Sequence, residues 1–113
     1  MSESKTEIPY GTLDLLILQS LHAMGPMHGY RLARRMEQVS GDLLRLNQGS
    51  IYPALIRLEQ AGLIRTEWGV SETNRKVKFY SLTRLGRKEL ESEAENWRRL
   101  SSAISRVVQL SEA

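Results

Sequence analysis

Residues 47–64 read NQGSIYPALIRLEQAGLI, and this stretch decides the fold because it combines an amphipathic helix with a clear stop. Apolar side chains recur at helical spacing and form one stripe: Ile51, Ala54, Leu55 and Leu58. Gly62 ends the helix, since glycine readily takes the left-handed conformation at a helix C-terminus. The other side carries polar residues and Arg57, with Ser50 and Tyr52 at its margins. Such a helix packs one face on a core and presents the other outward.

The start of this helix depends on Pro53. Proline has no N–H group, and the first turn of a helix leaves its N–H groups without helical partners. If Ser50 is the N-cap, Pro53 therefore lies where it loses nothing. If Asn47 is the N-cap, Pro53 falls inside the helix and kinks it. The sequence leaves both starts open.

The chain before this stretch predicts two more helices, the first over about residues 12–24 with Thr12 as N-cap. A Gly-Pro pair at 25–26 is an abrupt stop. One face has apolar residues at helical spacing: Leu13, Leu16, Ile17, Leu21 and Met24. Leu15 and Leu18 make the helix apolar on more than one side, so we expect a second partner besides its own core.

The second helix is predicted from about residue 27 to residue 40, and Gly41 closes it. Its apolar face consists of Leu32, Ala33, Met36 and Val39. His28 lies at the helix start, where a histidine most often caps the helix or packs its ring, and a DNA contact is the less favoured interpretation. Gly29 beside it predicts a close approach between helices.

After Gly62 the apolar period changes from 3.6 towards 2, which is typical of strands. The segment LIRTEWGV at 63–70 alternates Ile64, Thr66 and Trp68 against Arg65 and Glu67. The segment RKVKFYSL at 75–82 alternates Val77, Phe79 and Ser81 against Lys76, Lys78 and Tyr80. A β-hairpin with the loop SETN follows from this pattern, and Thr83 then starts a final helix.

Three helices, a hairpin and a last helix form the order of a winged helix-turn-helix. The expected fold class is mainly α with a small β-hairpin (α+β), in which the third helix reads DNA and the hairpin is the wing. We predict a DNA-binding domain at residues 1–84, with a flexible N-terminus at 1–9, and a C-terminal dimerisation helix at 85–113.

Positive charge is concentrated in the middle of the chain, although the formal net charge of all 113 residues is only +3. Residues 31–88 hold twelve basic and five acidic side chains, a net charge of +7, whereas residues 1–30 and 89–113 each carry −2. A basic centre suits one face turned to a polyanion such as DNA. A solvated arginine-rich surface is the alternative from charge alone.

Composition excludes several classes of protein. The chain is 41% hydrophobic and 26% charged, as in a folded globular domain, and the absence of cysteine excludes disulfides and thiolate metal sites. His22 and His28 are the only imidazoles, and no catalytic constellation or phosphate loop occurs, so we expect neither an enzyme nor a cofactor. The polar N-terminus and the lack of a run of roughly 20 apolar residues predict a cytoplasmic protein without membrane contact.

The final helix carries an apolar stripe at steps near 3.5 residues: Leu90, Ala94, Trp97, Leu100, Ile104, Val107 and Val108. A helix that extends beyond a completed core needs a partner for such a stripe. We expect a twofold homodimer in which this helix packs on its mate and on the helix at 12–24. Packing onto the same domain is the alternative.

Four segments together resemble the PadR family of bacterial transcriptional regulators in its short form: GTLDLLILQSL at 11–21, GPMHGYRLARRM at 25–36, QGSIYPALIRLEQAGLI at 48–64 and FYSLTRLGRKEL at 79–90. Asn47-Gln48 departs from the Ser-Pro-Gly of many relatives, which affects the helix start. The resemblance implies a dimeric repressor, with the third helix in the major groove and the wing near the minor groove. Because a dimer pairs two basic third helices and wings, we expect a pseudo-palindromic operator. A winged-helix module for protein contacts is the alternative function.

The candidate DNA-binding residues are Gln48, Ser50, Tyr52, Arg57, Arg75, Lys76 and Lys78. Arg57 offers a fork for guanine or phosphate, and hydroxyls near a helix N-terminus suit phosphate. The alternatives are packing of Tyr52 on the preceding helix and simple solvation of Arg57 and of the wing cations. Some short PadR relatives resemble this chain at Trp97 and bind planar aromatic compounds between subunits, so Trp97 is a candidate effector site; core packing is its alternative.

Overall fold

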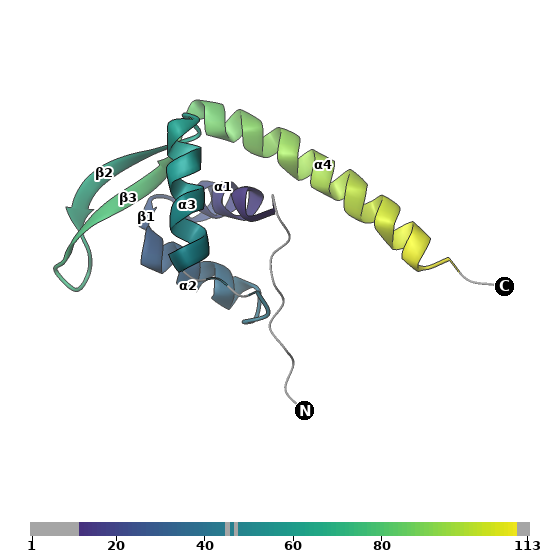
Figure 1. Ribbon diagram of the computed structural model, residues 1–113, viewed down its shortest axis with the longest axis horizontal. Coiled ribbons are helices and arrows are strands. Elements are labelled where there is room, and N and C mark those ends of the chain that lie inside the picture. The colour runs from purple at the N-terminus through teal and green to yellow at the C-terminus, as the bar shows by residue number, and fades with distance from the viewer. Residues whose placement is uncertain (1–11, 45, 47, 111–113) are drawn as a thin grey trace.

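The computed structural model describes residues 12–44, 46 and 48–110. The element order is α1 (Thr12–Met24), β1 (Met27–His28), α2 (Gly29–Val39), α3 (Gln48–Gln60), β2 (Ile64–Val70), β3 (Lys76–Leu82) and α4 (Arg84–Val108). Figure 1 shows α1, α2 and α3 gathered beside the sheet, the β2–β3 hairpin projecting on one side, and α4 extending far to the other. The predicted winged helix-turn-helix with a long last helix is therefore confirmed. The predicted flexible segment 1–9 lies outside the described residues.

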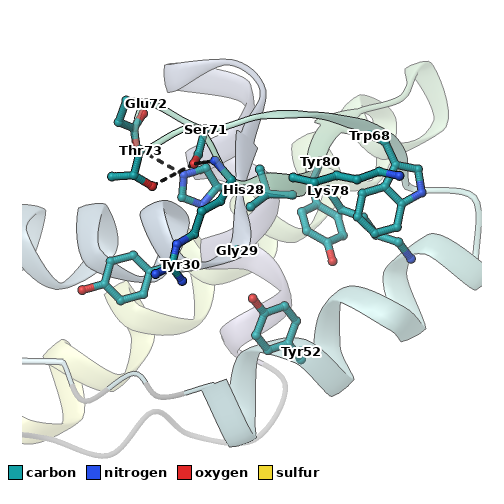
Figure 2. Close-up of a pocket in the computed structure, with 13 residues that line it drawn as sticks. His28, Gly29, Tyr30, Tyr52, Trp68, Ser71, Glu72, Thr73, Lys78 and Tyr80 are labelled. Carbon is teal, nitrogen blue, oxygen red and sulfur yellow. Dashed lines mark hydrogen bonds and ion pairs between the residues drawn. The ribbon is translucent and has the colours of Figure 1, made fainter.

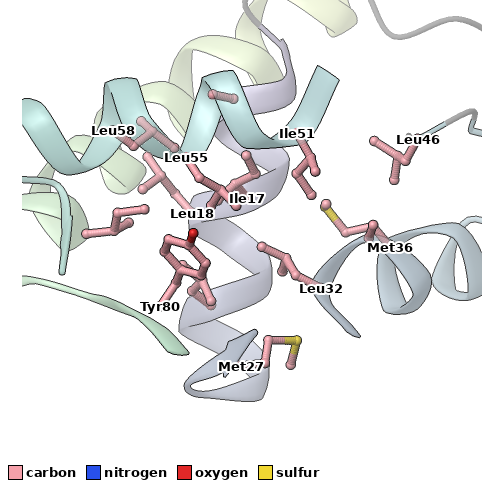
Figure 3. Packing of buried hydrophobic residues seen from close by; sticks show 14 of the residues in the cluster. Ile17, Leu18, Met27, Leu32, Met36, Leu46, Ile51, Leu55, Leu58 and Tyr80 are labelled. Atoms are coloured by element: carbon pink, nitrogen blue, oxygen red, sulfur yellow. The ribbon is translucent and has the colours of Figure 1, made fainter. Parts of the chain in front are cut away.

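The core lies where α1, α2 and α3 meet the sheet (Figure 3). The predicted stripe of α3 is buried at all four positions, which are Ile51, Ala54, Leu55 and Leu58. Other buried apolar residues come from α1, α2, the linker before α3, the sheet and α4: Ile17, Leu18, Leu21, Leu32, Ala33, Met36, Leu46, Ile64, Tyr80 and Leu90. The hydrophobic stabilisation of the domain comes from this single cluster.

The ends of α1 agree with the sequence only in part. The helix already includes Thr12, so the prediction of Thr12 as its N-cap was wrong. The stop is confirmed: Gly25 has a φ of 83° and donates its N–H to the carbonyl of Leu21 at 3.0 Å. Only glycine takes this left-handed backbone at little cost.

The sheet has a third strand that the sequence did not predict. Met27 and His28 were expected to begin the second helix, but they form β1 and pair antiparallel with β3, opposite Tyr80 and Phe79. Pairing with β3 keeps their backbone extended, and the His28 ring then caps α2, its Nδ1 accepting a hydrogen bond from the Arg31 N–H at 3.4 Å. The prediction of His28 as a cap is confirmed, and α2 begins at Gly29.

Val39 was predicted in the apolar face of α2, and this was wrong, because the side chain is 72% exposed. The helix ends at Val39, and the chain turns away through Gly41 and Asp42, which both have positive φ angles. Leu46 from the following linker is buried in the core instead. Its N–H donates to Oε2 of Glu37 at 3.3 Å.

The structure excludes one of the two starts considered for α3. The helix begins at Gln48 and contains Ser50, so Ser50 is not its N-cap. Asn47, the alternative cap, lies outside the described residues. Pro53 is inside the helix and cannot donate a hydrogen bond to the carbonyl four residues earlier. The proline lies on the exposed side of α3, away from the buried stripe.

The wing is a regular hairpin in which Ile64 pairs with Leu82 and Val70 pairs with Lys76. One face turns towards the helices and buries Ile64 and Tyr80. The register places Trp68 on this same face, opposite Lys78, but further out, where the indole is 59% exposed. The strand alternation is therefore confirmed, with Tyr80 on the core side of β3.

Thr83 and Gly86 fix the start of α4. The Thr83 hydroxyl accepts from the Gly86 N–H at 3.0 Å and donates to the carbonyl of Gly62 at 2.7 Å, which confirms Thr83 as the N-cap. A Cβ at Gly86 would lie 2.0 Å from the Leu63 carbonyl oxygen, so only glycine allows this approach. Helix α4 then crosses α1 and leaves the domain (Figure 1). None of the helices in the described part is both long and apolar enough to span a membrane.

Candidate nucleic-acid interface

A groove with a cavity volume of about 580 Å³ runs between the start of α2, the side of α3 and the wing. Figure 2 shows Tyr52 facing it from α3, Tyr80 and His28 near its floor, and Trp68 and Lys78 on the wing side. We call this space the wing groove. Four of the predicted DNA-binding residues line it: Tyr52, Arg75, Lys76 and Lys78.

Tyr52 enters the wing groove because Gly29 leaves room for it. A Cβ at Gly29 would lie 3.0 Å from both Cε1 and the hydroxyl oxygen of Tyr52. Gly29 thus permits the close approach predicted for it, and Tyr52 packs on α2, as the alternative interpretation predicted, while part of the ring stays exposed. Burial, and then the nearby Tyr52 and Glu59, raise the pKa of Tyr80 above its usual 10.0, so its hydroxyl remains a hydrogen-bond donor.

The wing cations are organised around Trp68, which the sequence analysis did not single out. The ammonium groups of Lys76 and Lys78 lie 5.2 Å and 5.6 Å from the centre of the indole ring. At this range a cation is attracted by the face of an aromatic ring. The cross-strand register was the signal for this cluster, because it sets Trp68 opposite Lys78. The indole therefore holds the ammonium groups of Lys76 and Lys78 close together on one face of the wing.

The wing loop is joined to the start of α2 through Glu72. Its Oε1 lies 3.4 Å from Nε2 of His28, and its Oε2 lies 3.9 Å from Nη1 of Arg31. The hydrogen bond with His28, with smaller contributions from its own backbone and from Arg31, lowers the pKa of Glu72 below its usual 4.5. The ring of His28 also meets Phe79 edge to face, with 5.8 Å between ring centres. His28 is thus both a cap and a packed ring.

Arg57 lies apart from the wing groove. Its Nη2 forms an ion pair with Oδ1 of Asp14 on α1, and its side chain is 59% exposed. Tyr52 and Arg57 are five residues apart, which places them about 140° apart around the helix axis at 3.6 residues per turn. Ser50 is exposed near the start of α3, and the side chain of Gln48 lies outside the described part. The outward face between Tyr52 and Arg57 carries Pro53, Ile56 and Gln60.

A second groove, with a cavity volume of about 520 Å³, lies between α1 and α4 and contains Trp97, Leu100 and Leu15. Glu93 lies in the same groove. Burial, a hydrogen bond with Glu89 and the charges of Glu89 and Asp14 raise the pKa of Glu93 from 4.5 to about 7. This carboxyl is therefore largely protonated below neutral pH, next to the exposed indole.

The predicted dimerisation stripe divides into two parts. Leu90 is only 4% exposed and packs in the core of its own domain, so little of its surface is left for a partner copy. Its assignment to the dimer interface stays a prediction. Ala94 is half-buried beside it. The remaining members face solvent in the single chain: Trp97, Leu100, Ile104, Val107 and Val108. The stripe therefore runs along most of α4. Its first turn packs in the core of the domain, and its later turns leave their apolar side chains exposed.

The sequence model described as the transcriptional regulator PadR-like family matches residues 17–92, which include the core, the wing and the first part of α4. The chain belongs to this family. Its members are transcriptional regulators, which agrees with the resemblance of the sequence segments and with the winged-helix fold. Among the described residues, no group of three or more His, Cys, Asp or Glu side chains is placed to hold a metal ion.

Solved PadR-like and related regulators share this fold. A transcriptional regulator from Clostridium thermocellum is 27% identical with a TM-score of 0.79, and the match covers 88% of this chain and 95% of that one. A PadR family regulator from Clostridium difficile is 29% identical with a TM-score of 0.73, covering 87% and 99%. A 37.1 kDa protein of a Streptomyces fradiae transposon is 44% identical over 91 residues. The match covers 80% of this chain but only 24% of that protein.

Proposed function

We propose that this PadR-like chain is a dimeric, sequence-specific DNA-binding repressor. The observation that carries the proposal is the placement of α3: its apolar stripe is buried, its outward face is exposed, and a basic wing lies beside it across the wing groove. A helix with one exposed face fits the major groove of DNA. The family supports the regulatory role.

In this proposal the two elements have different tasks. Helix α3 enters the major groove, where residues of its outward face and Tyr52 meet bases and phosphates. The wing, with Lys76 and Lys78 on Trp68, lies on the backbone or in the adjacent minor groove. Contacts to phosphate position the protein and contacts to base edges select the sequence. We therefore propose that the wing positions the protein on the DNA backbone and that α3 selects the operator sequence.

Dimerisation belongs to α4 in this proposal. The apolar side chains of α4 beyond Ala94 are exposed in the single chain, and a second copy related by a twofold axis would cover them. A twofold dimer matches a pseudo-palindromic operator with half-sites roughly 34–36 Å apart on one face of the duplex.

We also assign Trp97 to a small-molecule site for planar aromatic cations, next to the dimer contact. The groove between α1 and α4 supports this assignment, because it joins an exposed indole to the carboxyl of Glu93. An indole face attracts flat cationic ligands, and Glu93 adds charge complementarity above its pKa of about 7, where it is a carboxylate. Binding there would change how α4 lies on α1 and thereby the spacing of the two α3 helices.

Salt dependence tests the function. Genome-wide mapping of bound fragments would supply the operator, and its affinity would be measured against a random duplex from low to high salt. We expect the logarithm of both affinities to fall linearly with log salt, with a slope of about −0.9 for each phosphate neutralised. A protein-interaction module would bind neither duplex. Failure to bind any mapped fragment at low salt would refute the proposed function.

A further inference from the structure

Glu72 places a carboxylate at the start of α2, within a surface that otherwise suits DNA. Its two oxygens face Nε2 of His28 at 3.4 Å and Nη1 of Arg31 at 3.9 Å. Glu72 is mostly exposed, whereas the His28 side chain is only 10% exposed, so the contact joins an exposed carboxylate to the edge of a nearly buried ring. Neither His28 nor Arg31 has a role in the proposed function so far.

The contact lies in the wing groove that Tyr52 and the wing lysines also line. Figure 2 shows Glu72 above His28 on one side of the groove, and Trp68 with Lys78 on the other. A carboxylate in this position neutralises positive charge at one end of a groove whose other end carries two ammonium groups. Glu72 therefore lowers the attraction of the groove for a polyanion.

We infer that His28 and Arg31 form a binding site for one phosphodiester of the DNA backbone, and that Glu72 occupies this site until DNA displaces it. The inference rests on the proposed function. A phosphodiester resembles the Glu72 carboxylate in having two free oxygens that share one negative charge, and it suits an arginine fork together with a ring N–H.

Displacement of Glu72 is favourable on energetic grounds. The exposed pair of Glu72 with Arg31 is weak, because water competes for both partners, so little stability is lost when it opens. The part-buried N–H of the His28 ring exchanges the Glu72 carboxylate for a phosphate oxygen and so keeps an acceptor. The arriving phosphate belongs to a strand that the wing lysines hold at the other end of the wing groove. Glu72 thus acts as a residue that limits affinity for DNA without touching a base.

The test compares Glu72→Gln with Glu67→Gln, a matched loss of one carboxylate at an exposed position of β2. We expect Glu72→Gln to tighten binding to operator and random duplex by about two- to fivefold, the range of an exposed ion pair. The salt slope should stay nearly unchanged, because DNA displaces Glu72 in the wild type and the same phosphates are neutralised in both complexes. Glu67→Gln should tighten binding by less than Glu72→Gln. Thermal unfolding would confirm that both variants fold.

A double-mutant cycle with Arg31→Gln identifies the mechanism. Arg31→Gln alone should weaken binding, and in its background most of the gain from Glu72→Gln should disappear. A gain that persists without Arg31, or one that Glu67→Gln matches, would mean that only the net charge matters. Weaker binding by Glu72→Gln would show that the carboxylate orders the wing loop. Each of these results would overturn the site.

Two further measurements distinguish a phosphodiester site from a site for free phosphate, and failure of the site from failure of the proposed function. The NMR signals of the His28 ring and the Arg31 guanidinium should shift with duplex and stay unchanged with inorganic phosphate at the same ionic strength. A shift with inorganic phosphate alone would reassign the site to free phosphate. If the wild-type chain binds duplex with the expected salt slope while the cycle shows no coupling, the proposed function stands and this site is wrong.

Discussion

Gly86 shows how strongly a single residue constrains the junction between the wing and α4. A Cβ there would lie 2.0 Å from the Leu63 carbonyl oxygen, a backbone atom that cannot move without disturbing the turn before β2. We predict that Gly86→Ala lowers the free energy of unfolding by about 1–3 kcal/mol or more, as overpacking does. Urea denaturation would measure this. Gly25→Ala is the control, because Gly25 has open space around it and only the cost of a left-handed backbone, about 1–2 kcal/mol. A smaller loss for Gly86→Ala than for Gly25→Ala would contradict the steric argument.

The raised pKa of Glu93 makes the free energy of unfolding depend on pH. Its pKa is about 7 in the folded chain and 4.5 without the fold, so between these values the folded state holds a proton that the unfolded state has released. Stability is therefore highest below this window and falls as the pH rises through it. We predict that Glu93→Gln raises the urea midpoint at pH 8 and leaves it nearly unchanged at pH 4.5. Glu91→Gln, at an exposed position of the same helix, is the control. An equal loss of stability with pH in the wild type and Glu93→Gln would disprove the role of this carboxyl.

A substitution at Arg57 tests whether α3 contacts bases on the side of the helix that faces away from the wing. Its ion pair with Asp14 lies at the surface, with the Arg57 side chain 59% and the Asp14 side chain 23% exposed, and should contribute only about 0.2–1 kcal/mol to stability. We predict that Arg57→Ala nevertheless weakens operator binding by about 1–3 kcal/mol, the value of a good bidentate base contact. Fluorescence anisotropy with labelled operator would measure it, and Arg98→Ala on α4 is the matched control. Unchanged operator affinity would mean that Arg57 does not contact the operator and only links α3 to α1 through its ion pair with Asp14.

The wing acts as a unit, because Trp68 holds both of its lysines on one face. We predict that the double variant Lys76→Gln/Lys78→Gln weakens binding to operator and random duplex alike. The salt slope should fall by roughly 1 for each phosphate that the wing no longer neutralises, and specificity should survive. Lys88→Gln, on α4, is the control for loss of charge. Loss of operator binding with retention of random binding would mean that the wing reads bases.

At the scale of the whole molecule, the proposed dimer depends on the exposed apolar side chains of α4. We predict that Trp97→Ala weakens dimerisation, because an indole contributes a large apolar area, while the domain stays folded through Leu90. Sedimentation equilibrium would measure the dimer constant and circular dichroism the fold. Ser102→Ala, an exposed change on the same helix, is the control. A dimer constant unaffected by Trp97→Ala would remove Trp97 from the interface.

The proposed effector site at Trp97 adds a distinct observable. Planar aromatic cations should quench its emission and release DNA over the same concentration range. A Trp68→Phe background leaves Trp97 as the reporter, since the chain has two tryptophans. Compounds that leave both emission and DNA complex unchanged would exclude this chemical class.

Local patterns in the sequence were sufficient for the four helices and the hairpin, but not for β1. The stripe of α3, the stop at Gly62, the alternation in the wing and the cap at Thr83 were all predicted correctly, because each depends on neighbours within a few residues. The errors at Thr12 and Val39 lie at helix ends. There the spacing of residue types still fits a helix, but the side chains no longer contact the core. The placement of Leu90 within the domain also depends on contacts, since periodicity alone cannot tell which turn of α4 leaves the core.

What the sequence by itself determined is therefore the order, type and approximate length of the four helices and the hairpin, and, through four segments of its own, the resemblance to the family. The tertiary structure decided which of the candidate residues share a surface: Tyr52 meets the wing, whereas Arg57 turns to Asp14. It also created β1 and the contact between His28 and Glu72, which are 44 residues apart. Periodicity reports on a side chain's neighbours along one element. Contacts across elements depend on how the elements pack, and no local pattern encodes that arrangement.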